Sequence, residues 1–367
     1  MIFMENKYIY FEEDAKDYTK MLEGKKITVI GYGNQGRAQA LNLRDSGCRV
    51  IIGNIEDKYK QRAIQDNFEV FGIEEAVRQA DIIFILIPDE NIPDIFENSI
   101  RKNLKEGALI NFASGYNIAF ELVKPPENID VIMIAPRMIG VGVRQRYLSG
   151  QGFYSLVSVY QNYSGQAKKL LLALCKALGS LKAGAIEVTM KQEAILDLFN
   201  EQAFGPAFGR LLLTAINVLI KNGIQPEAVL CEMYLSEEMS YIYKKFKEIG
   251  IVKQMALHSH TSQYGSLTRS IKYLRLGKEL EKKFQETFND IASGNFAKEW
   301  QSKLAKIKFK IIKYFATKQK INKIEEQVHR NLRMKQINIE DVEDIDELIA
   351  KDEFKDQVKE IEDWFEY

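Results

Sequence analysis

The chain has 367 residues, 46% of them hydrophobic and 28% charged, and its formal net charge is zero. This length provides for two domains with a substantial core, and this composition excludes a chain that is disordered throughout or a small scaffold held together by disulfides. The charge is unevenly spread, because residues 336–367 hold 13 acids against 3 lysines, a net of −10, so the remaining residues carry +10.

The cysteines and the N-terminal residues indicate the compartment. Cys48, Cys175 and Cys231 lie far apart without CxxC spacing, which argues against a disulfide framework and against a zinc site. The N-terminal residues carry acids where a signal peptide has a basic flank and an apolar core. No uninterrupted apolar run reaches the roughly 18 residues that a membrane-spanning helix needs. We therefore expect a cytoplasmic protein that does not enter a membrane.

The first half of the chain alternates strand-like apolar runs with helix-like segments. The first run, KITVIG, ends in a glycine, and a helical stretch follows it at residues 35–46. Runs that are apolar throughout and separated by helices are typical of a parallel sheet with both faces covered. The expected strands are residues 26–31, 48–53, 81–88, 108–114, 130–136, 153–160 and 185–189.

After Met190 the apolar residues take helical spacing, with no strand candidate up to residue 335. Breaks between helices are expected at Gly223–Pro226, at Gly250 and at Gly265, because glycine and proline interrupt helices. The expected fold class is therefore α/β. A Rossmann-type domain with a parallel sheet at residues 1–189 precedes an all-helical domain at 190–335, and an acidic tail follows at 336–367.

The sequence GYGNQG at residues 31–36 is a GxGxxG motif between an apolar strand and a helix. In that context Gly31 permits a tight turn, Gly33 lets the backbone approach a pyrophosphate, and Gly36 allows helix and strand to pack closely. The helix N-terminus then faces the anion with free N–H groups. The motif therefore predicts a site for a nicotinamide dinucleotide.

The choice between NAD and NADP depends on the end of the second strand, where an acid would bind the ribose hydroxyls of NAD. The run GNIED at residues 53–57 has no acid at the strand end itself. Lys58 and Lys60 can hold a 2′-phosphate, whereas Glu56 and Asp57 would repel one. We favour NADP as the cofactor and keep NAD open.

The run VIGYGNQGRAQALNLRDSG at residues 29–47 resembles the opening of a ketol-acid reductoisomerase, and the resemblance extends over roughly residues 8–335. It continues in LIPDE (86–90), NLKEGALINFASGYNI (103–118), PPENIDVIMIAPR (125–137), DLFNEQ (197–202), GIQPE (223–227), TSQYG (261–265) and SGNFAKEW (293–300). The resemblance implies a magnesium-dependent alkyl migration in a 2-acetolactate-type acid, followed by reduction of the resulting 2-keto acid by NADPH, in branched-chain amino-acid biosynthesis. It also implies that the helical domains pair, which gives a homodimer or higher homo-oligomer with active sites built from two chains.

The resemblance also places the functional residues. Asp197 and Glu201 match the family's metal ligands, and with Glu193 they stand four apart on one face of a predicted helix; alone, this series would be interpreted as a solvated acidic stripe. Glu232 matches a third metal ligand, and Ser259 matches the serine that contacts the substrate carboxylate. The expected cofactor contacts are Gly31, Tyr32, Gly33, Gln35, Gly36, Lys58, Lys60, Pro88 and Ser114.

Three positions depart from the family pattern, and all three bear on the chemistry. Ser114 replaces a histidine, so any acid–base role of that side chain near neutral pH is lost. Arg137 replaces a lysine and keeps its charge but not its size or its ability to release a proton. Ser236 stands where another glutamate is expected, with Glu237 adjacent. The expected catalytic residues are Ser114, Arg137, Asp197 and Glu201.

The chain has three histidines. His258 and His260 flank Ser259 and can supply a base to the paired active site; the alternative is that both are exposed loop residues. His329 lies in a lysine-rich helical stretch and is expected at the surface.

Three functions are compatible with these residues. The first is ketol-acid reductoisomerase activity on an acetolactate-type acid. The second is NAD(P)H-dependent reduction of another small 2-keto or 2-hydroxy acid or carbonyl substrate, without alkyl migration. The third is a non-catalytic dinucleotide-binding subunit that docks a partner through the acidic tail. Nucleic-acid binding is not expected, because the lysine-rich stretch at residues 303–335 belongs to the region of resemblance and precedes the acidic tail.

Overall fold

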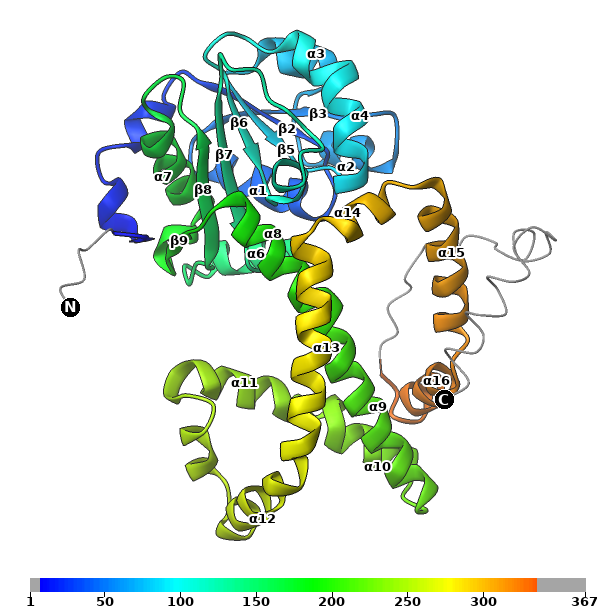
Figure 1. Ribbon diagram of the computed structural model, residues 1–367. Coiled ribbons are helices and arrows are strands. Elements are labelled where there is room, and N and C mark those ends of the chain that lie inside the picture. Colours follow the sequence, from blue (N-terminus) through cyan, green and yellow to red (C-terminus); the bar gives the residue numbers. More distant parts are fainter. Residues whose placement is uncertain (1–6, 335–367) are drawn as a thin grey trace. The chain divides into compact units, whose positions relative to one another are not determined.

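The computed structural model describes residues 7–334 and is shown in Figure 1. The chain divides after Asp197 into two compact units, and this division falls inside helix α8 (Met190–Phe199). All strands of the described chain belong to the first unit, and the second unit is helical, so the expected order of an α/β half and an all-helical half is confirmed. The acidic tail expected at residues 336–367 lies outside the described residues.

The first unit contains a nine-stranded sheet in the order β1-β9-β8-β7-β6-β5-β2-β3-β4. All seven expected strands are present, and the two that the sequence did not indicate, β1 and β4, have two residues each. The strands are β1 (Ile9–Tyr10), β2 (Lys26–Ile30), β3 (Arg49–Gly53), β4 (Val70–Phe71), β5 (Ile82–Ile85), β6 (Leu109–Phe112), β7 (Asp130–Pro136), β8 (Ser155–Gln161) and β9 (Ala185–Glu187).

Most neighbouring strands are parallel, as expected, but β8 runs antiparallel to β7 and β1 runs antiparallel to β9. The last residue of β7, Pro136, pairs with the first residue of β8, Ser155. The chain therefore leaves the sheet and re-enters it at the same edge, with helix α6 (Gly140–Leu148) between the two strands. The direction of a strand follows from the segment that connects it to its neighbour and not from its own side chains. The apolar runs in the sequence therefore did not reveal that β1 and β8 are antiparallel to β9 and β7.

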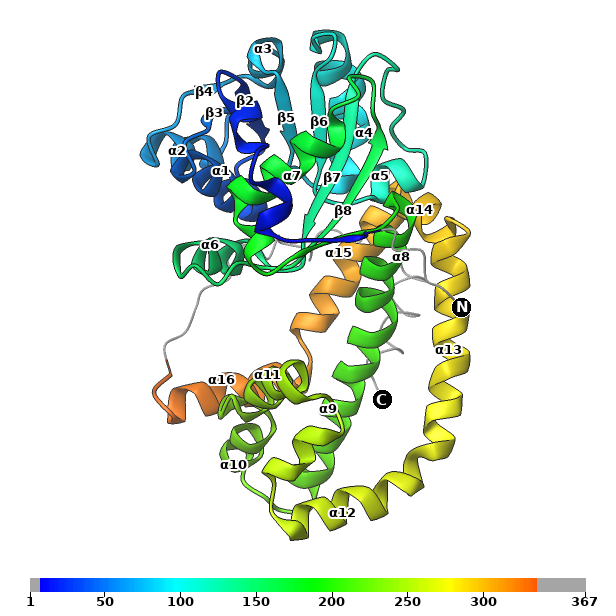
Figure 2. The ribbon, with the colours of Figure 1, turned by 90° about the vertical axis from the view of Figure 1, so that its left-hand side faces the viewer.

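Both faces of the sheet are covered, which explains why its strands are apolar throughout. On β5, Ile82 and Phe84 pack into the core cluster that includes α1 and α7, while Ile83 and Ile85 pack into the cluster that includes α3 and α4. Successive side chains of a strand point to opposite faces, so both sets must be apolar. The helices, shown in Figures 1 and 2, are α1 (Asn34–Asp45), α2 (Lys58–Gln65), α3 (Ile73–Gln79), α4 (Ile92–Ile95), α5 (Tyr116–Ala119), α6 and α7 (Ala167–Leu178), with the short helices η1 (Glu12–Ala15), η2 (Thr19–Leu22), η3 (Asp89–Asn91), η4 (Phe96–Ile100), η5 (Arg101–Asn103) and η6 (Ser180–Lys182).

The second unit begins with the last residues of α8, which are followed by η7 (Asn200–Phe204), a π-helix, and α9 (Gly205–Lys221). Two expected breaks are confirmed, because α9 ends before Gly223 and α11 ends before Gly250. The break expected at Gly265 is wrong, because this residue lies inside α12 and a single helical glycine costs only about 1 kcal/mol relative to alanine. The remaining helices are α10 (Pro226–Leu230), η8 (Cys231–Leu235), α11 (Glu238–Ile249), η9 (Lys253–Leu257), α12 (His260–Ser270), η10 (Ile271–Tyr273), α13 (Leu274–Ala292), α14 (Asn295–Trp300), α15 (Lys303–Thr317) and α16 (Lys320–Asn331).

The second unit leaves much apolar surface uncovered. A core cluster in this unit has four buried members, Ile216, Val229, Leu230 and Val328. One described helical segment, Met190–Lys221, is long and apolar enough by length and composition to cross a membrane, with 11% of its most apolar window buried. The sequence was expected to contain no apolar run long enough to span a membrane, because polar residues interrupt this segment. Residues 202–219 nevertheless hold only one charged residue, which makes their average composition apolar.

Candidate cofactor cleft and active site

The glycine motif lies where the sequence placed it, between the end of β2 and the start of α1. Gly31 has a left-handed backbone (φ +90°), and its N–H donates to the carbonyl of Gly53 over 2.9 Å. A Cβ on Gly31 would lie 2.7 Å from the carbonyl oxygen of Leu86, and a Cβ on Gly36 would lie 2.0 Å from that of Gly31. A Cβ on Gly33 would meet nothing within 4 Å. The first and third glycines are thus needed by the fold, and the second leaves open space before the helix N-terminus, where a pyrophosphate can approach.

A cleft of about 540 Å³ opens at the carboxyl ends of β2, β3, β5 and β6. Ligands of α/β proteins bind in this position, outside the carboxyl ends of the strands. Its lining includes six of the expected cofactor contacts, Gly31, Tyr32, Gly33, Gln35, Pro88 and Ser114. Gly36, Lys58 and Lys60 do not line it, whereas Asn54, Asp57 and Tyr59 do.

Two of the expected contacts use their side chains to hold the glycine loop. The Tyr32 ring is buried, and its hydroxyl donates to Asp66 over 2.9 Å. Burial, followed by this bond to Asp66, raises the pKa of Tyr32, so the phenol stays neutral. The Gln35 amide donates to the carbonyl of Met138 over 2.9 Å. Tyr32 and Gln35 therefore face the cleft mainly through their backbone.

The turn after β3 is held by Asp57, which was expected only to repel a 2′-phosphate. Asp57 caps α2 by accepting hydrogen bonds from the backbone N–H groups of Tyr59 (2.9 Å) and Lys60 (3.0 Å). It also accepts from the side-chain amide nitrogen of Asn54 over 2.8 Å, and the side-chain oxygen of Asn54 accepts from the backbone N–H of Tyr32 over 3.2 Å. An aspartate just before a helical run is the sequence signal for such a cap.

The two lysines expected near the ribose have nearby partners. Lys60 is ion-paired with Glu56, one helical turn away. The Lys58 ammonium lies 5.6 Å from the centroid of the Tyr59 ring. Both acids of this turn are thus engaged, Asp57 as a cap and Glu56 as an ion-pair partner, which lowers the repulsion that a 2′-phosphate would meet.

At the far end of the cleft, Ser114 stands beside a buried carboxyl group. Ser114 follows β6, and its hydroxyl lies 3.4 Å from a carboxyl oxygen of Glu193 on α8. The same oxygen accepts the backbone N–H of Gly115 over 2.6 Å. Glu193 is 1% exposed, and burial raises its pKa to about 7, against the lowering effects of Gly115 and Arg137. Glu193 was not among the expected catalytic residues, although its spacing of four before Asp197 was the signal for it.

Arg137, which follows β7, joins two acids of α8. One guanidinium nitrogen lies 3.1 Å from Glu193, and the other lies 2.5 Å from Asp197. The structure therefore brings three of the four expected catalytic residues, Ser114, Arg137 and Asp197, together around Glu193 within the first unit. A planar guanidinium can serve two carboxylates at once, which the ammonium of a lysine does less well.

The other expected residues lie in the second unit. Glu201 lies in η7, Glu232 in η8, and Ser259 caps α12 by accepting the N–H of Ser262 over 3.2 Å. Glu237 has a left-handed backbone (φ +60°) and lies at the helix break between η8 and α11.

The two histidines beside Ser259 differ in their surroundings. His258 is half-buried, and its Nε2 lies 3.0 Å from the side-chain oxygen of Gln254. His260 opens α12 and is exposed. In this single chain His258 thus has a local structural partner, while His260 faces solvent.

The carboxylates expected to bind metal are hard oxygen donors of the kind that magnesium prefers, and magnesium usually retains several waters beside one or two of them. Asp197 and Glu201 stand one helical turn apart in the chain, so their chemistry and spacing fit such an ion. Within residues 7–334 of this single chain, no group of three or more histidine, cysteine, aspartate and glutamate side chains is gathered to hold a metal.

Comparison with known proteins gives concordant matches over both halves. Residues 21–184 match the family model described as acetohydroxy acid isomeroreductase, NADPH-binding domain, and residues 190–335 match ketol-acid reductoisomerase, C-terminal domain. The chain is 44% identical to the ketol-acid reductoisomerase (NADP(+)) of Pyrobaculum aerophilum over 80% of this chain and 88% of that protein. It is 42% identical to that of Pyrobaculum islandicum over 81% and 89%. The structure of an NADH-preferring ketol-acid reductoisomerase from an uncultured archean matches with a TM-score of 0.81 and 35% identity, over 88% of this chain and 98% of that one.

Proposed function

The chain belongs to the ketol-acid reductoisomerase family and is an oxidoreductase, and from this premise we propose that it is an NADPH-dependent, magnesium-assisted enzyme for an acetolactate-type acid. The observation that carries the proposal is the single cleft that runs from the open space at Gly33 to Ser114. It joins a pyrophosphate position to Ser114, whose hydroxyl lies 3.4 Å from Glu193. A place in branched-chain amino-acid biosynthesis follows from the family.

The proposed roles divide along the cleft. Gly33 and the N-terminus of α1 bind the pyrophosphate, while Ser114 lies where the nicotinamide ring would end. Beyond it, Arg137 orients two carboxyl groups by bonding to both Glu193 and Asp197. We assign residues 1–189 to dinucleotide binding and residues 190–335 to metal binding, substrate binding and dimerisation, in line with the two family spans.

Asp197 and Glu201 are the residues that would hold magnesium, with Glu232 as a third ligand from another helix. Magnesium there would polarise a ketone oxygen and so favour alkyl migration. Arg137 already occupies one oxygen of Asp197 at 2.5 Å. The guanidinium and the ion would therefore compete for this carboxylate.

NADP is the cofactor that the turn after β3 favours. The strand ends at Gly53 without an acid, and Glu56 is paired with Lys60. Asp57 lines the cleft while Lys58 and Lys60 do not, so NADP binding would require these lysines to turn toward the 2′-phosphate. The NADH preference stated for the uncultured archaeal relative keeps NAD as the alternative. Comparing the Michaelis constants for NADPH and NADH decides this point, and a lower constant for NADH would contradict the assignment.

A second candidate function follows from Ser114, which replaces the expected histidine and does not titrate near neutral pH. The chain would then reduce a small 2-keto acid directly and not carry out alkyl migration. The deciding experiment follows NADPH consumption by the purified full chain with magnesium, using 2-acetolactate in one assay and hydroxypyruvate in the other. Turnover of acetolactate supports the first function. Turnover of hydroxypyruvate alone supports the second, and no turnover of either contradicts both.

We also propose a cytoplasmic homo-oligomer with active sites shared between chains. The support is that Glu201, Glu232 and Ser259 belong to a unit with much exposed apolar surface, including Phe204 and Val218 of the segment next to them. The alternative of a non-catalytic subunit rests on the acidic tail at residues 336–367, which lies outside the described residues.

A further inference from the structure

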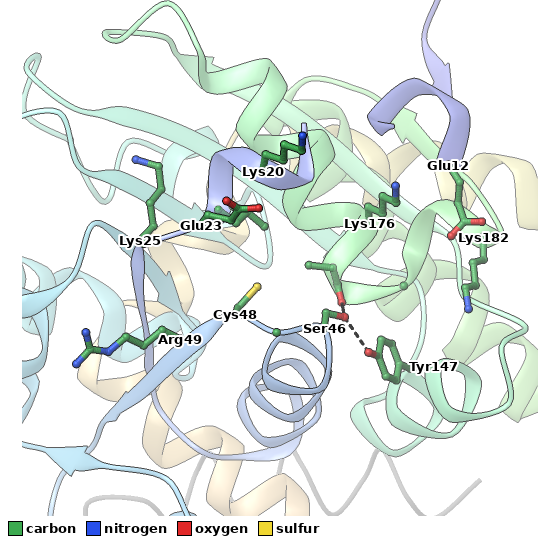
Figure 3. A pocket seen from close by; sticks show the side chains of 15 residues that line it. Glu12, Lys20, Glu23, Lys25, Ser46, Cys48, Arg49, Tyr147, Lys176 and Lys182 are labelled. Carbon is green, nitrogen blue, oxygen red and sulfur yellow. Dashed lines mark hydrogen bonds between the residues drawn. The ribbon is translucent and has the colours of Figure 1, made fainter. Parts of the chain in front are cut away.

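A second hollow, of about 700 Å³, lies at the opposite edge of the sheet from the cofactor cleft (Figure 3). Lys25 and Arg49 mark this edge, because they stand just before β2 and at the start of β3, whereas Gly31 and Gly53 of the cleft stand where these strands end. The end of α7 at Ala177 and the turn after α1 at Ser46 complete the wall. The hollow belongs wholly to the first unit, and we call it the basic pocket.

The basic pocket gathers positive charge. It is lined by two acids, Glu12 and Glu23, and by five cations, a net of 5 − 2 = +3; the cations are Lys20, Lys25, Arg49, Lys176 and Lys182. They come from separate segments and lie around the margin of the view in Figure 3, where Lys25 and Arg49 extend away from Ser46 on the opposite side from Lys182. Like charges around one hollow repel one another, so their assembly costs free energy unless an anion offsets it.

The usual structural reasons for surface lysines cover only part of this set. Lys20, Lys176 and Lys182 lie in the last turns of η2, α7 and η6, where a cation stabilises a helix C-terminus. Lys25 and Arg49 belong to no helix. Over residues 7–334, none of the five cationic side chains of the pocket forms an ion pair. Other lysines of the same unit do: Lys105 pairs with Asp81 (3.0 Å) and Lys168 with Glu187 (2.7 Å).

The floor of the basic pocket is neutral and partly apolar. The Ser46 hydroxyl donates to the carbonyl of Ala177 over 2.6 Å, so in its 2.7 Å bond with Tyr147 the phenol is the donor (Figure 3). Leu22 and Cys48 add carbon and sulfur surface. Burial raises the pKa of the Cys48 thiol to about 11, so it adds no negative charge at neutral pH.

We propose that the basic pocket binds a small organic molecule that carries two or more phosphate groups, at a site separate from the cofactor cleft. The pocket's volume lies within the roughly 300–1,000 Å³ typical of small-molecule sites. Separate ammonium groups and one guanidinium at the rim suit separate phosphates, and the neutral floor suits an organic body. Because the two hollows lie at opposite edges of the sheet, the ligand does not compete with NADPH.

The test uses the full chain, freed of metal with EDTA and then dialysed free of EDTA, with NADPH at one equivalent per chain. The dinucleotide site is then filled, and no excess of NADPH or EDTA, which are themselves polyanions, competes with the probe for the basic pocket. Fructose 1,6-bisphosphate, inorganic pyrophosphate and sulfate are titrated calorimetrically at matched ionic strength. We expect saturable binding of the bisphosphate at one molecule per chain and no saturation by sulfate. The double variant Arg49→Glu and Lys176→Glu should weaken bisphosphate binding at least about tenfold.

The matched control is Lys124→Glu with Lys169→Glu, which changes the net charge equally at two exposed lysines outside the pocket. It should leave bisphosphate binding unchanged, and both double variants should keep the NADPH affinity and a cooperative melt. If the pocket variant does not fold, Lys20→Gln with Lys182→Gln tests the rim with a neutral change. Equal losses in pocket and control variants, binding of pyrophosphate alone, or no saturable binding of the bisphosphate would each overturn the proposal.

Discussion

At the scale of single residues, Arg137 shows how one substitution changes what neighbouring groups do. Its guanidinium is bonded to Glu193 at 3.1 Å and to Asp197 at 2.5 Å. A lysine at this position carries the same charge on one nitrogen and has no fork to share between two carboxyl groups. Arginine therefore binds a carboxylate that the proposed function assigns to magnesium.

The variant Arg137→Lys is expected to bind magnesium about two- to fivefold more tightly, since a half-exposed ion pair contributes roughly 0.5–1 kcal/mol. Calorimetric titration with magnesium in the absence of substrate measures this directly. Arg144→Lys is the control, because Arg144 bonds to Asp45 at 2.5 Å away from the cleft. Unchanged affinity in Arg137→Lys would contradict competition at Asp197, whereas no magnesium binding by any protein would contradict the metal site itself.

The glycine motif makes a second pair of residue-scale predictions. Gly33→Ala should fold normally, because its Cβ meets nothing within 4 Å, yet weaken NADPH binding at least about tenfold by blocking the approach of the pyrophosphate. Gly36→Ala should lower the free energy of unfolding by about 1–3 kcal/mol, because its Cβ would lie 2.0 Å from the carbonyl oxygen of Gly31. Urea unfolding and NADPH fluorescence separate the two effects. Equal loss of stability in both variants would show that the two glycines do not have different roles.

Asp66 gives a pH-dependent prediction away from the chemistry. It accepts hydrogen bonds from Arg37 and Tyr32, and the bond from Arg37 is the main cause that holds its pKa below the usual 3.8. A lowered folded-state pKa stabilises the fold above about pH 4 and loses this effect as the pH falls through the folded value. Asp66→Asn should therefore unfold more easily at pH 7, by roughly 1–2 kcal/mol, with a smaller difference near pH 3. A difference that stays constant with pH would exclude the charge as its cause.

At the scale of elements, the sequence predicted what depends on local pattern and missed what depends on connections. The seven longer strands and the glycine turn were predicted because apolar runs and GxGxxG spacing are local signals. The antiparallel direction of β8 was missed because it follows from the return of the chain beside Pro136. In the site, Ser114, Arg137 and Asp197 were expected from motifs, but the burial of Glu193 among them depends on how α8 packs against the strand ends.

Helix α12 provides a prediction at this scale, because the break expected at Gly265 does not occur. Nothing lies within 4 Å of a Cβ on Gly265, and its φ is not in the left-handed region. Gly265→Ala should therefore raise the free energy of unfolding by about 0.5–1 kcal/mol through the lower entropy of the unfolded chain. Denaturant unfolding measures this free energy. Gly250→Ala is the opposite case: Gly250 has φ +97°, so this variant should be less stable than the wild type. A loss of stability in Gly265→Ala would contradict the uninterrupted helix.

At the scale of the whole molecule, the second unit raises the question of what covers its apolar surface. Exposed members of α9 include Phe208 (40%), Leu211 (48%) and Val218 (54%). Isolated chains do not usually expose contiguous apolar patches of this kind, which mark association sites or membrane contacts. The family resemblance favours a second copy of the chain, and a membrane is the alternative that the length and composition of Met190–Lys221 leave open.

The double variant Phe208→Asp and Leu211→Asp should convert the proposed homo-oligomer into monomers, because paired apolar faces do not tolerate buried unpaired charges. Sedimentation velocity measures the mass, and vesicle flotation of the wild-type chain tests the membrane alternative. NADPH affinity should persist, since the cofactor cleft lies within the first unit, while turnover should fall because the proposed active site needs residues of a second chain. Leu148→Asp, at an exposed apolar residue of the first unit, should leave the mass unchanged. A monomeric wild-type chain that floats with vesicles would reject the shared site and assign α9 to a membrane surface.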